Sequence, residues 1–178
     1  RARRVLVMQL FRIARTEFIS DLSGTGSRLY GGRWNQKGTA LIYASESRAL
    51  AALEYLVHFP MALAPTDLSI LRIDVPDDTD VKTVQMASLP KDWRAYPPPQ
   101  DLPSIGTKWA LSNETLLLRV PSVVVDAEFN YLINPSHPGF KRIRPRRPQP
   151  FVLDQRLRRH VQDLLQPFSL HDPNLSGA

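Results

Sequence analysis

The chain has 178 residues, of which 43% are hydrophobic, and it carries a formal net charge of +6. This length and hydrophobic content are typical of one globular domain with a full core. The absence of cysteine excludes disulfides, a thiolate metal site and a cysteine nucleophile, and no apolar run has the length that a membrane span needs. We therefore expect a single-domain cytoplasmic protein that does not contact a membrane.

A strand is the first expected element. Residues 5–14 form an apolar run of strand length that contains Gln9 and Arg12. A single charge in such a run either faces solvent or points into a pocket, so the orientation of Arg12 stays open. Residues 16–26 are polar and rich in Gly and Ser, which predicts a loop.

The rest of the chain is organised around residues 28–58, which combine a loop, a strand and a helix. The Gly-Gly pair at 31–32 gives the loop conformational freedom, and Arg33 follows it directly. Residues 40–44 are a short apolar run that predicts a strand. The next segment, 45–59, is rich in Ala and Leu, lacks Gly and Pro, and begins with serines that can cap a helix, so it predicts a helix.

Glu54 lies in the middle of that helix. Its neighbours are apolar nearly all round, which predicts a helix buried in the core. A buried carboxylate is costly unless it is paired, hydrogen-bonded or used in chemistry. In one explanation, Glu54 pairs with Arg48 or His58, or extends its carboxylate to the edge of the buried face. In the other, it forms an active site with Arg33 and Tyr43, which lie near the ends of the preceding loop and strand.

The second half of the chain is expected to add short strands and helices. Residues 89–103 are rich in proline and should run extended over the surface. Pro121 and Ser122 interrupt an apolar stretch at a point where two strands would meet. Ser122 could present its hydroxyl to a cleft there, or it could be an ordinary turn residue. The remaining expected elements are strands at 67–75 and 130–135, a pair of strands within 114–125, and helices at 104–112 and 154–165.

The positive charge is concentrated in residues 1–4, 141–147 and 156–159. Prolines interrupt the second segment, no aromatic residues alternate with its arginines, and the chain lacks helix-turn-helix, zinc-finger and RNP patterns. Two interpretations stay open: a solvated basic surface, or attraction to an acidic partner or to phosphates. A nucleic-acid-binding or RNA-cleaving module is the corresponding alternative function.

The sequence carries no signal for a metal or for a common phosphate-binding loop. Its histidines, at 58, 137, 160 and 171, lack the spacing of metal ligands. It contains neither a P-loop nor a G-x-G-x-x-G fingerprint. We therefore expect no metal, and a nucleotide would have to be held in another way.

Residues 28–58 resemble the core signature of the RES domain, a family named for its Arg, Glu and Ser. They read RLYGGRWNQKGTALIYASESRALAALEYLVH. Three further pieces match the family in the same order: LFRIAR at 10–15, RVPSVVV at 119–125 and NYLINPSHPGF at 130–140. The resemblance covers residues 8–157, which is nearly the whole expected domain.

This resemblance implies a fold and an activity. RES proteins are the toxin halves of bacterial type II toxin–antitoxin pairs, and their fold is similar to that of ADP-ribosyltransferase toxins. The implied fold is a single α+β domain at 8–165, with small mixed β-sheets, flanking helices, and flexible termini at 1–7 and 166–178. The implied activity is degradation of NAD+ at the nicotinamide–ribose bond by hydrolysis or phosphorolysis, which arrests growth. Protein ADP-ribosylation is the alternative.

The resemblance also implies a partner. RES toxins are paired with Xre-like antitoxins that carry a helix-turn-helix and a C-terminal toxin-binding region. This chain would form a hetero-oligomer in which the antitoxin blocks the NAD+ site, and it would contact DNA only through the antitoxin. NAD+ would be its substrate, and no prosthetic group is implied.

The functional residues of the family have counterparts here. Its arginines correspond to Arg12 and Arg33, whose planar guanidinium groups suit the pyrophosphate of NAD+. Glu54 would stabilise an oxocarbenium-like transition state. Tyr43 would stack on nicotinamide, and Ser122 would hydrogen-bond its amide or a ribose hydroxyl. Catalysis is thus assigned to Glu54, Arg33 and Tyr43, and NAD+ binding to Arg12, Arg33, Tyr43, Ser122 and Asn130. The acceptor, which could be water, phosphate or a protein side chain, stays open.

Overall fold

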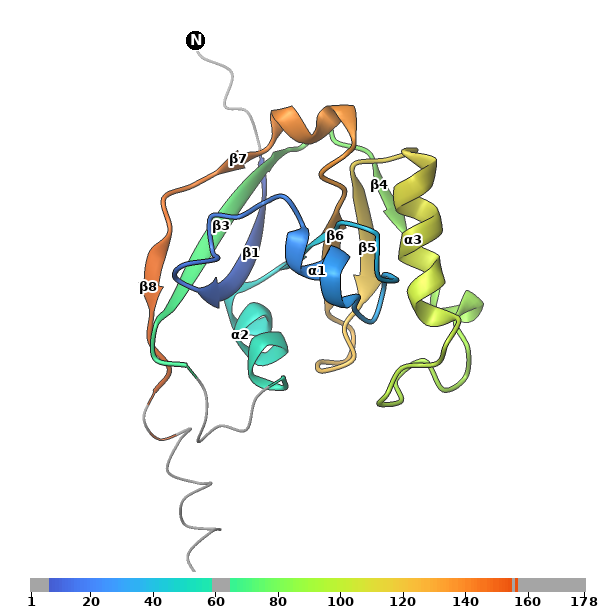
Figure 1. The fold of residues 1–178 in the computed structure, drawn as a ribbon, viewed down its shortest axis with the longest axis horizontal. Coiled ribbons are helices and arrows are strands. Elements are labelled where there is room, and N and C mark those ends of the chain that lie inside the picture. Colours follow the sequence, from blue (N-terminus) through green and yellow to red (C-terminus); the bar gives the residue numbers. More distant parts are fainter. Residues whose placement is uncertain (1–6, 59–64, 155, 157–178) are drawn as a thin grey trace, which may run out of the picture.

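The computed structural model describes residues 7–58, 65–154 and 156 (Figure 1). Its strands are β1 (Val7–Arg15), β2 (Ile42–Ser45), β3 (Leu68–Pro76), β4 (Val81–Thr83), β5 (Leu117–Pro121), β6 (Phe129–Ile133), β7 (Arg144–Pro145) and β8 (Gln149–Phe151). Its helices are α1 (Thr25–Tyr30), α2 (Arg48–Leu56) and α3 (Leu102–Ser112), with short 3-10 helices η2 (Met86–Ser88) and η3 (Pro138–Arg142).

The strands form one mixed sheet with the order β4-β5-β6-β2-β1-β3-β7, and β8 also pairs with β3. β4 and β5 run parallel, whereas the other paired strands are antiparallel. The predicted α+β fold class is confirmed, and the expected small sheets are joined into one. In the part of the chain that the structure describes, no helix is long and apolar enough to cross a membrane.

Most predicted elements are present, two predicted segments have another structure, and β4, β7, β8, η2 and η3 were not predicted. Residues 25–30, expected as loop, form α1. Residues 122–125, expected as a strand, form a bend instead. The cause is local, because the Ser122 hydroxyl oxygen accepts hydrogen bonds from the backbone N–H groups of Val124 and Val125, both at 3.0 Å. The predicted final helix and flexible termini fall almost entirely outside the described residues.

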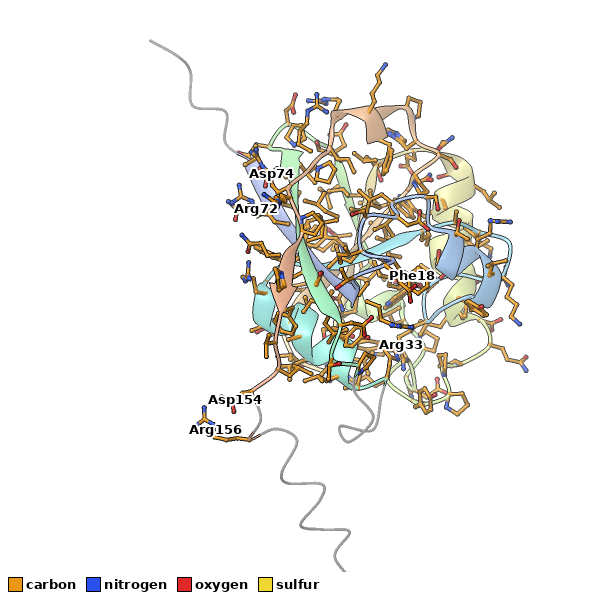
Figure 2. All side chains as sticks on the ribbon, turned by 60° about the vertical axis from the view of Figure 1, so that its left-hand side comes forward. Phe18, Arg33, Arg72, Asp74, Asp154 and Arg156 are labelled. Carbon is orange, nitrogen blue, oxygen red and sulfur yellow. The ribbon has the colours of Figure 1, made fainter. Side chains whose placement is uncertain are left out.

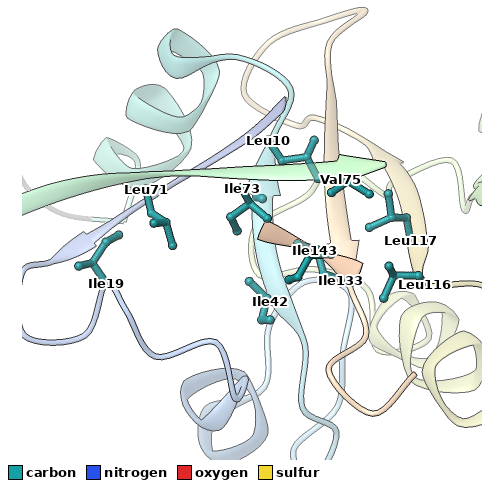
Figure 3. Packing of buried hydrophobic residues seen from close by; sticks show 11 residues of the cluster. Leu10, Ile19, Ile42, Leu71, Ile73, Val75, Leu116, Leu117, Ile133 and Ile143 are labelled. Atoms are coloured by element: carbon teal, nitrogen blue, oxygen red, sulfur yellow. The ribbon is translucent and has the colours of Figure 1, made fainter. Parts of the chain in front are cut away.

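The longest part of the sheet is a nine-residue antiparallel ribbon of β1 and β3, which runs from Val7 opposite Pro76 to Arg15 opposite Leu68. Alternate residues of each strand point to opposite faces. One face packs a cluster of buried aliphatic side chains (Figure 3): Leu10, Ile19, Ile42, Leu71, Ile73, Val75, Leu116, Leu117, Ile133 and Ile143.

Helix α2 packs beside β1, with Ala51 against the ribbon side chains Ile13 and Ile70. Its N-cap is Ser47, whose hydroxyl accepts a hydrogen bond from the backbone N–H of Leu50 at 3.0 Å. The prediction of a helix buried all round is wrong. Leu53 is 43% exposed and Val57, just past the helix, is 58% exposed, because α2 presents only one side to the sheet and the other to solvent.

Helix α3 lies at the β4–β5 end of the sheet (Figure 1) and packs through Leu102 and Trp109. It also holds the loop that carries Arg33. A Cβ atom at Gly106 would lie 2.1 Å from the backbone oxygen of Trp34, so this approach of helix and loop requires glycine.

β1 and β2 are neighbours in the sheet, yet they pair only at Phe11 opposite Ser45. By contrast, β2 pairs with β6 over all four of its residues. The two strands therefore diverge from a single contact. Arg12 on β1 and Tyr43 on β2 lie to either side of the resulting space.

Candidate active site

A cavity of about 390 Å³ opens between β1, the α1 region, β2 and α2. A second cavity of about 190 Å³ adjoins it. The residues predicted to act on NAD+ that line the larger cavity are Arg12, Arg33, Tyr43, Glu54 and Asn130. All of these except Arg33 also line the smaller one, so the two cavities meet around the same side chains.

Glu54 reaches this junction from α2. Its Oε1 atom accepts hydrogen bonds from the Ser122 hydroxyl at 2.7 Å and from the Asn130 amide at 2.6 Å. Among the described residues, Oε2 accepts no hydrogen bond, and Glu54 forms no ion pair with Arg48 or His58. The first explanation from the sequence, a simple ion pair, is therefore wrong. Neutral donors hold the carboxylate and leave one oxygen open.

Ser122 lies behind Glu54 and is 1% exposed. Because its oxygen accepts from two backbone N–H groups, its hydroxyl proton must point to Glu54. The donor and both lone pairs are then in use. Ser122 is therefore placed to orient the carboxylate rather than to touch a ligand, which differs from the contact with NAD+ that the sequence predicted.

Asn130 is fixed by the pairing of β2 with β6, where it stands opposite Ser45. The Ser45 hydroxyl donates to its Oδ1 at 2.6 Å. This bond turns the amide nitrogen of Asn130 toward Glu54. The sheet register thus determines the direction of the carboxylate.

Arg33 follows the Gly-Gly turn and lies on the far side of the larger cavity. Its Nη1 donates to the backbone oxygens of Trp93 at 2.8 Å and Ala95 at 3.2 Å, and its Nη2 donates to Ala95 at 3.2 Å. A guanidinium has five N–H donors, so donors are left for a ligand. Partial burial lowers the pKa of Arg33, and the nearby Glu54 carboxylate opposes that change. Arg33 therefore ties the proline-rich segment 89–103 to the site.

Tyr43 lines both cavities, and its hydroxyl is held from behind. The hydroxyl donates to Asn35 Oδ1 at 2.6 Å and accepts from the backbone N–H of Trp34 at 3.2 Å. Burial raises the pKa of Tyr43 well above its ordinary value. The hydroxyl therefore stays protonated, which leaves the ring as the part of Tyr43 that can meet a ligand.

The sequence left open whether Arg12 faces solvent or a pocket. In the structure its side chain lines both cavities. Its Nε is buried and has no hydrogen-bond partner among the described residues. Burial lowers the pKa of Arg12, and the charge of Asp21 opposes this. Buried donors are nearly always satisfied. A guanidinium with an unsatisfied Nε at a cavity wall therefore suits an anionic ligand.

Two residues of the site were missed from the sequence. Asn35 is 1% exposed, and its amide donates to the backbone oxygens of Ser27, Gln36 and Thr39, which fixes the loop before Tyr43. Asp21 lines the larger cavity near Arg12. Both lie in irregular segments, where periodicity gives no information. In the described part of the chain, no three His, Asp or Glu side chains come together as a metal site.

Comparison with known proteins places this chain in a family. The RES domain matches residues 9–154. The chain belongs to the RES domain family. The resemblance seen in its motifs is therefore confirmed.

Curated relatives of this RES domain are toxins. One from Sphingobium sp. (strain YBL2), named Prs ADP-ribosylating toxin, is 43% identical over 146 residues, which are 81% of this chain and 91% of the relative. A Toxin Res from Yersinia enterocolitica is 37% identical over 153 residues, which are 85% of this chain and all of the relative. The chain is thus a RES domain toxin.

The fold has a counterpart among solved structures. A chain in the crystal structure of the M. tuberculosis MbcT–MbcA toxin–antitoxin complex matches this RES toxin with a TM-score of 0.63 at 19% identity. The match covers 89% of this chain and 91% of that chain. The two proteins share a fold.

Proposed function

We propose that this RES toxin consumes NAD+ by breaking the bond between nicotinamide and ribose. One observation carries the proposal. Where the two cavities meet, a carboxylate with an open oxygen, Glu54, shares the walls with Arg12, a buried guanidinium whose Nε lacks a hydrogen-bond partner among the described residues. NAD+ supplies a counterpart to each group, because its pyrophosphate is anionic and its ribose becomes cationic in the reaction.

The first chemical step is dissociation. As the bond between ribose C1″ and the nicotinamide nitrogen breaks, its electron pair stays on nicotinamide, which departs neutral, and positive charge develops on the ribose. Glu54 stabilises that charge through Oε2, since its Oε1 is occupied by Ser122 and Asn130. Both of these donors are neutral, so the carboxylate keeps its full charge for the transition state.

Other residues of the cavity walls bind the remaining parts of NAD+. Arg12 and the remaining donors of Arg33 hold the pyrophosphate, and the ring of Tyr43 stacks on nicotinamide. Water then captures the ribosyl cation and loses a proton to give ADP-ribose. Alternatively, phosphate captures it through one oxygen to give ADP-ribose 1″-phosphate.

The test is NAD+ consumption by the purified toxin, with products identified by NMR in the presence and absence of phosphate. Nicotinamide with ADP-ribose is the expected result for hydrolysis. Nicotinamide with ADP-ribose 1″-phosphate, formed only with phosphate, is the expected result for phosphorolysis. No loss of NAD+ under either condition, and none after a cell lysate is added, would contradict the proposal.

Protein ADP-ribosylation is the second candidate, and it is favoured by the name of the Sphingobium relative, Prs ADP-ribosylating toxin. The same dissociation would occur, but a side chain of a target protein would capture the ribose. Incubation of a lysate with toxin and NAD+ labelled in the adenylate distinguishes the two. Label that becomes attached to one protein band indicates transfer, whereas label found only in small molecules indicates degradation.

We also propose that an Xre-like antitoxin covers the cleft and blocks NAD+. Exposed apolar side chains support this: Tyr30, which lines the larger cavity, is 77% exposed, and Val57 beside Glu54's helix is 58% exposed. An exposed apolar residue that lines a cleft, as Tyr30 does, favours a protein partner. The chain of similar fold was solved in a toxin–antitoxin complex. Unchanged NAD+ turnover with saturating antitoxin would refute this part.

A further inference from the structure

A third cavity, of about 300 Å³, lies apart from the candidate active site. It is lined by Arg48, Ile70, Arg72, Arg146, Arg147 and Gln149. It shares no residue with either cavity around Glu54. Arg72 stands opposite Phe11 in the ribbon, whereas Arg12 stands opposite Leu71, so Arg72 and Arg12 leave opposite faces of the sheet. Figure 2 shows Arg72 and Asp74 well separated from Arg33.

A buried carboxylate organises this arginine cavity. Asp74 is 2% exposed. It accepts hydrogen bonds from Arg72 Nε at 2.6 Å and Nη2 at 3.0 Å, and its Oδ2 also accepts from Arg146 Nε at 2.7 Å. The strand pairing adds a backbone bond from the Arg146 N–H to the Arg72 oxygen at 2.8 Å. Two guanidinium groups are thus held in fixed positions, with donors left over.

The charges at this cavity do not balance. Among the described residues, only the Asp74 carboxylate bonds to the four arginines of the cavity. Four guanidinium groups and one carboxylate leave a net charge of three positive charges. Arg48 and Arg147 form no ion pair with a described residue, and Arg48 has its Cζ 5.8 Å from the ring of Phe11. Prolines at 145, 148 and 150 restrict the backbone that carries Arg146 and Arg147. Four arginines that line one cavity suit a bound polyanion.

We propose that this cavity binds a compact phosphate polyanion of the pyrophosphate class. Among the described residues, Ile70 is the one apolar residue of its wall and no aromatic ring lines it, so the cavity recognises charge rather than a nucleobase. Guanidinium forks match phosphate oxygens in pairs. Pyrophosphate has two adjacent phosphoryl groups. Its negative charge is similar in size to the net positive charge of the four arginines and Asp74. The basic segment 141–147, whose role the sequence left open, contributes two of the four arginines.

The test is titration of the toxin with pyrophosphate by isothermal calorimetry, in about 0.15 M salt so that diffuse attraction is screened. Arg48→Gln and Arg147→Gln are the test variants, because neither removes a partner of buried Asp74. Each should weaken binding about tenfold, and the double variant more. Lys108→Gln, an exposed residue of α3, is the matched charge control and should bind like the wild type.

The NAD+ site also contains arginines, so Arg12→Gln separates the two sites. Pyrophosphate binding that survives Arg12→Gln and is lost in the Arg48→Gln/Arg147→Gln variant supports the proposal. Binding that is lost in Arg12→Gln alone overturns it, as does equal weakening by Lys108→Gln or no binding at all. Sulfate and inorganic phosphate should bind more weakly than pyrophosphate, and equal affinity for sulfate would indicate an adventitious anion site. Thermal melts confirm that each variant is folded. NAD+ turnover is not used, so the outcome is independent of the proposed function.

Discussion

Glu54 and Asp74 are two carboxylates on the same domain with opposite surroundings. Asp74 accepts hydrogen bonds from two arginines, and these bonds, with that of Arg72 the strongest cause, hold its pKa below the ordinary value. Glu54 is held by Ser122 and Asn130, which carry no charge. A carboxylate that is already neutralised stabilises a structure, whereas one held by neutral donors in a cleft can still act on a cation.

The largest expected effect comes from Glu54→Gln. The amide keeps the size of the side chain and can still accept from Ser122 through its oxygen, but it removes the negative charge. NAD+ consumption should fall about a thousandfold, with little change in the melting temperature. Glu114→Gln, which changes an exposed carboxylate near α3, is the control and should keep full activity. A Glu54→Gln toxin as active as this control would end the assignment.

Arg12→Gln should give the next largest effect on activity. Removing a guanidinium from the pyrophosphate should raise the KM for NAD+ about a hundredfold, since charge-assisted hydrogen bonds to phosphate are among the stronger ones. The same change removes a buried donor that lacks a partner, so the ligand-free protein should become slightly more stable. The two readouts, kinetics and thermal unfolding, move in opposite directions. A loss of stability without a change in KM would show that Arg12 is structural.

Asp74→Asn tests the other carboxylate. Its arginine partners are 39% and 60% exposed, so solvent screens part of the attraction, and the free energy of unfolding should fall by about 2 kcal/mol. NAD+ turnover should be unchanged.

Folding lowers the pKa of Asp74. Its contribution to stability is therefore full above the pKa of the unfolded state, about 3.9, and is lost as the pH falls through the pKa of the folded state. The free energies of unfolding of the wild type and of Asp74→Asn should therefore differ above pH about 3.9 and become equal below the folded-state pKa.

The sequence predicted the site better than it predicted the surroundings of the site. Arg33, Tyr43 and Glu54 were found because a turn, a strand and a helix follow one another there with clear local signals. The structure brings Tyr43 and Glu54 together with Arg12 and Asn130 where the two cavities meet, and it places Arg33 on the far side of the larger cavity. Their chemical roles stay predictions. The helix of Glu54 was expected to be buried all round, because composition alone does not show which side of a helix meets a sheet.

Other features depend on contacts between distant segments and left no local signal. The hydrogen bonds from Arg33 to the backbone oxygens of Trp93 and Ala95 join residues about sixty positions apart. The arginine cavity combines α2, β3 and the β7–β8 segment. A basic run in the sequence indicated charge there, but only the buried Asp74 shows that two of the arginines are held in place.

Ser122→Ala should have a smaller effect than the changes above, but the most informative pattern. If Ser122 touched NAD+, its loss would change KM. The structure instead directs its proton to Glu54 and leaves it 1% exposed, so we expect kcat to fall about tenfold while KM stays nearly constant, because the carboxylate loses one of its two orienting donors. Ser45→Ala is the matched comparison, since its hydroxyl acts on Glu54 only through Asn130, and it should lower kcat less. A rise in KM for Ser122→Ala, with kcat unchanged, would instead show that Ser122 binds NAD+ directly.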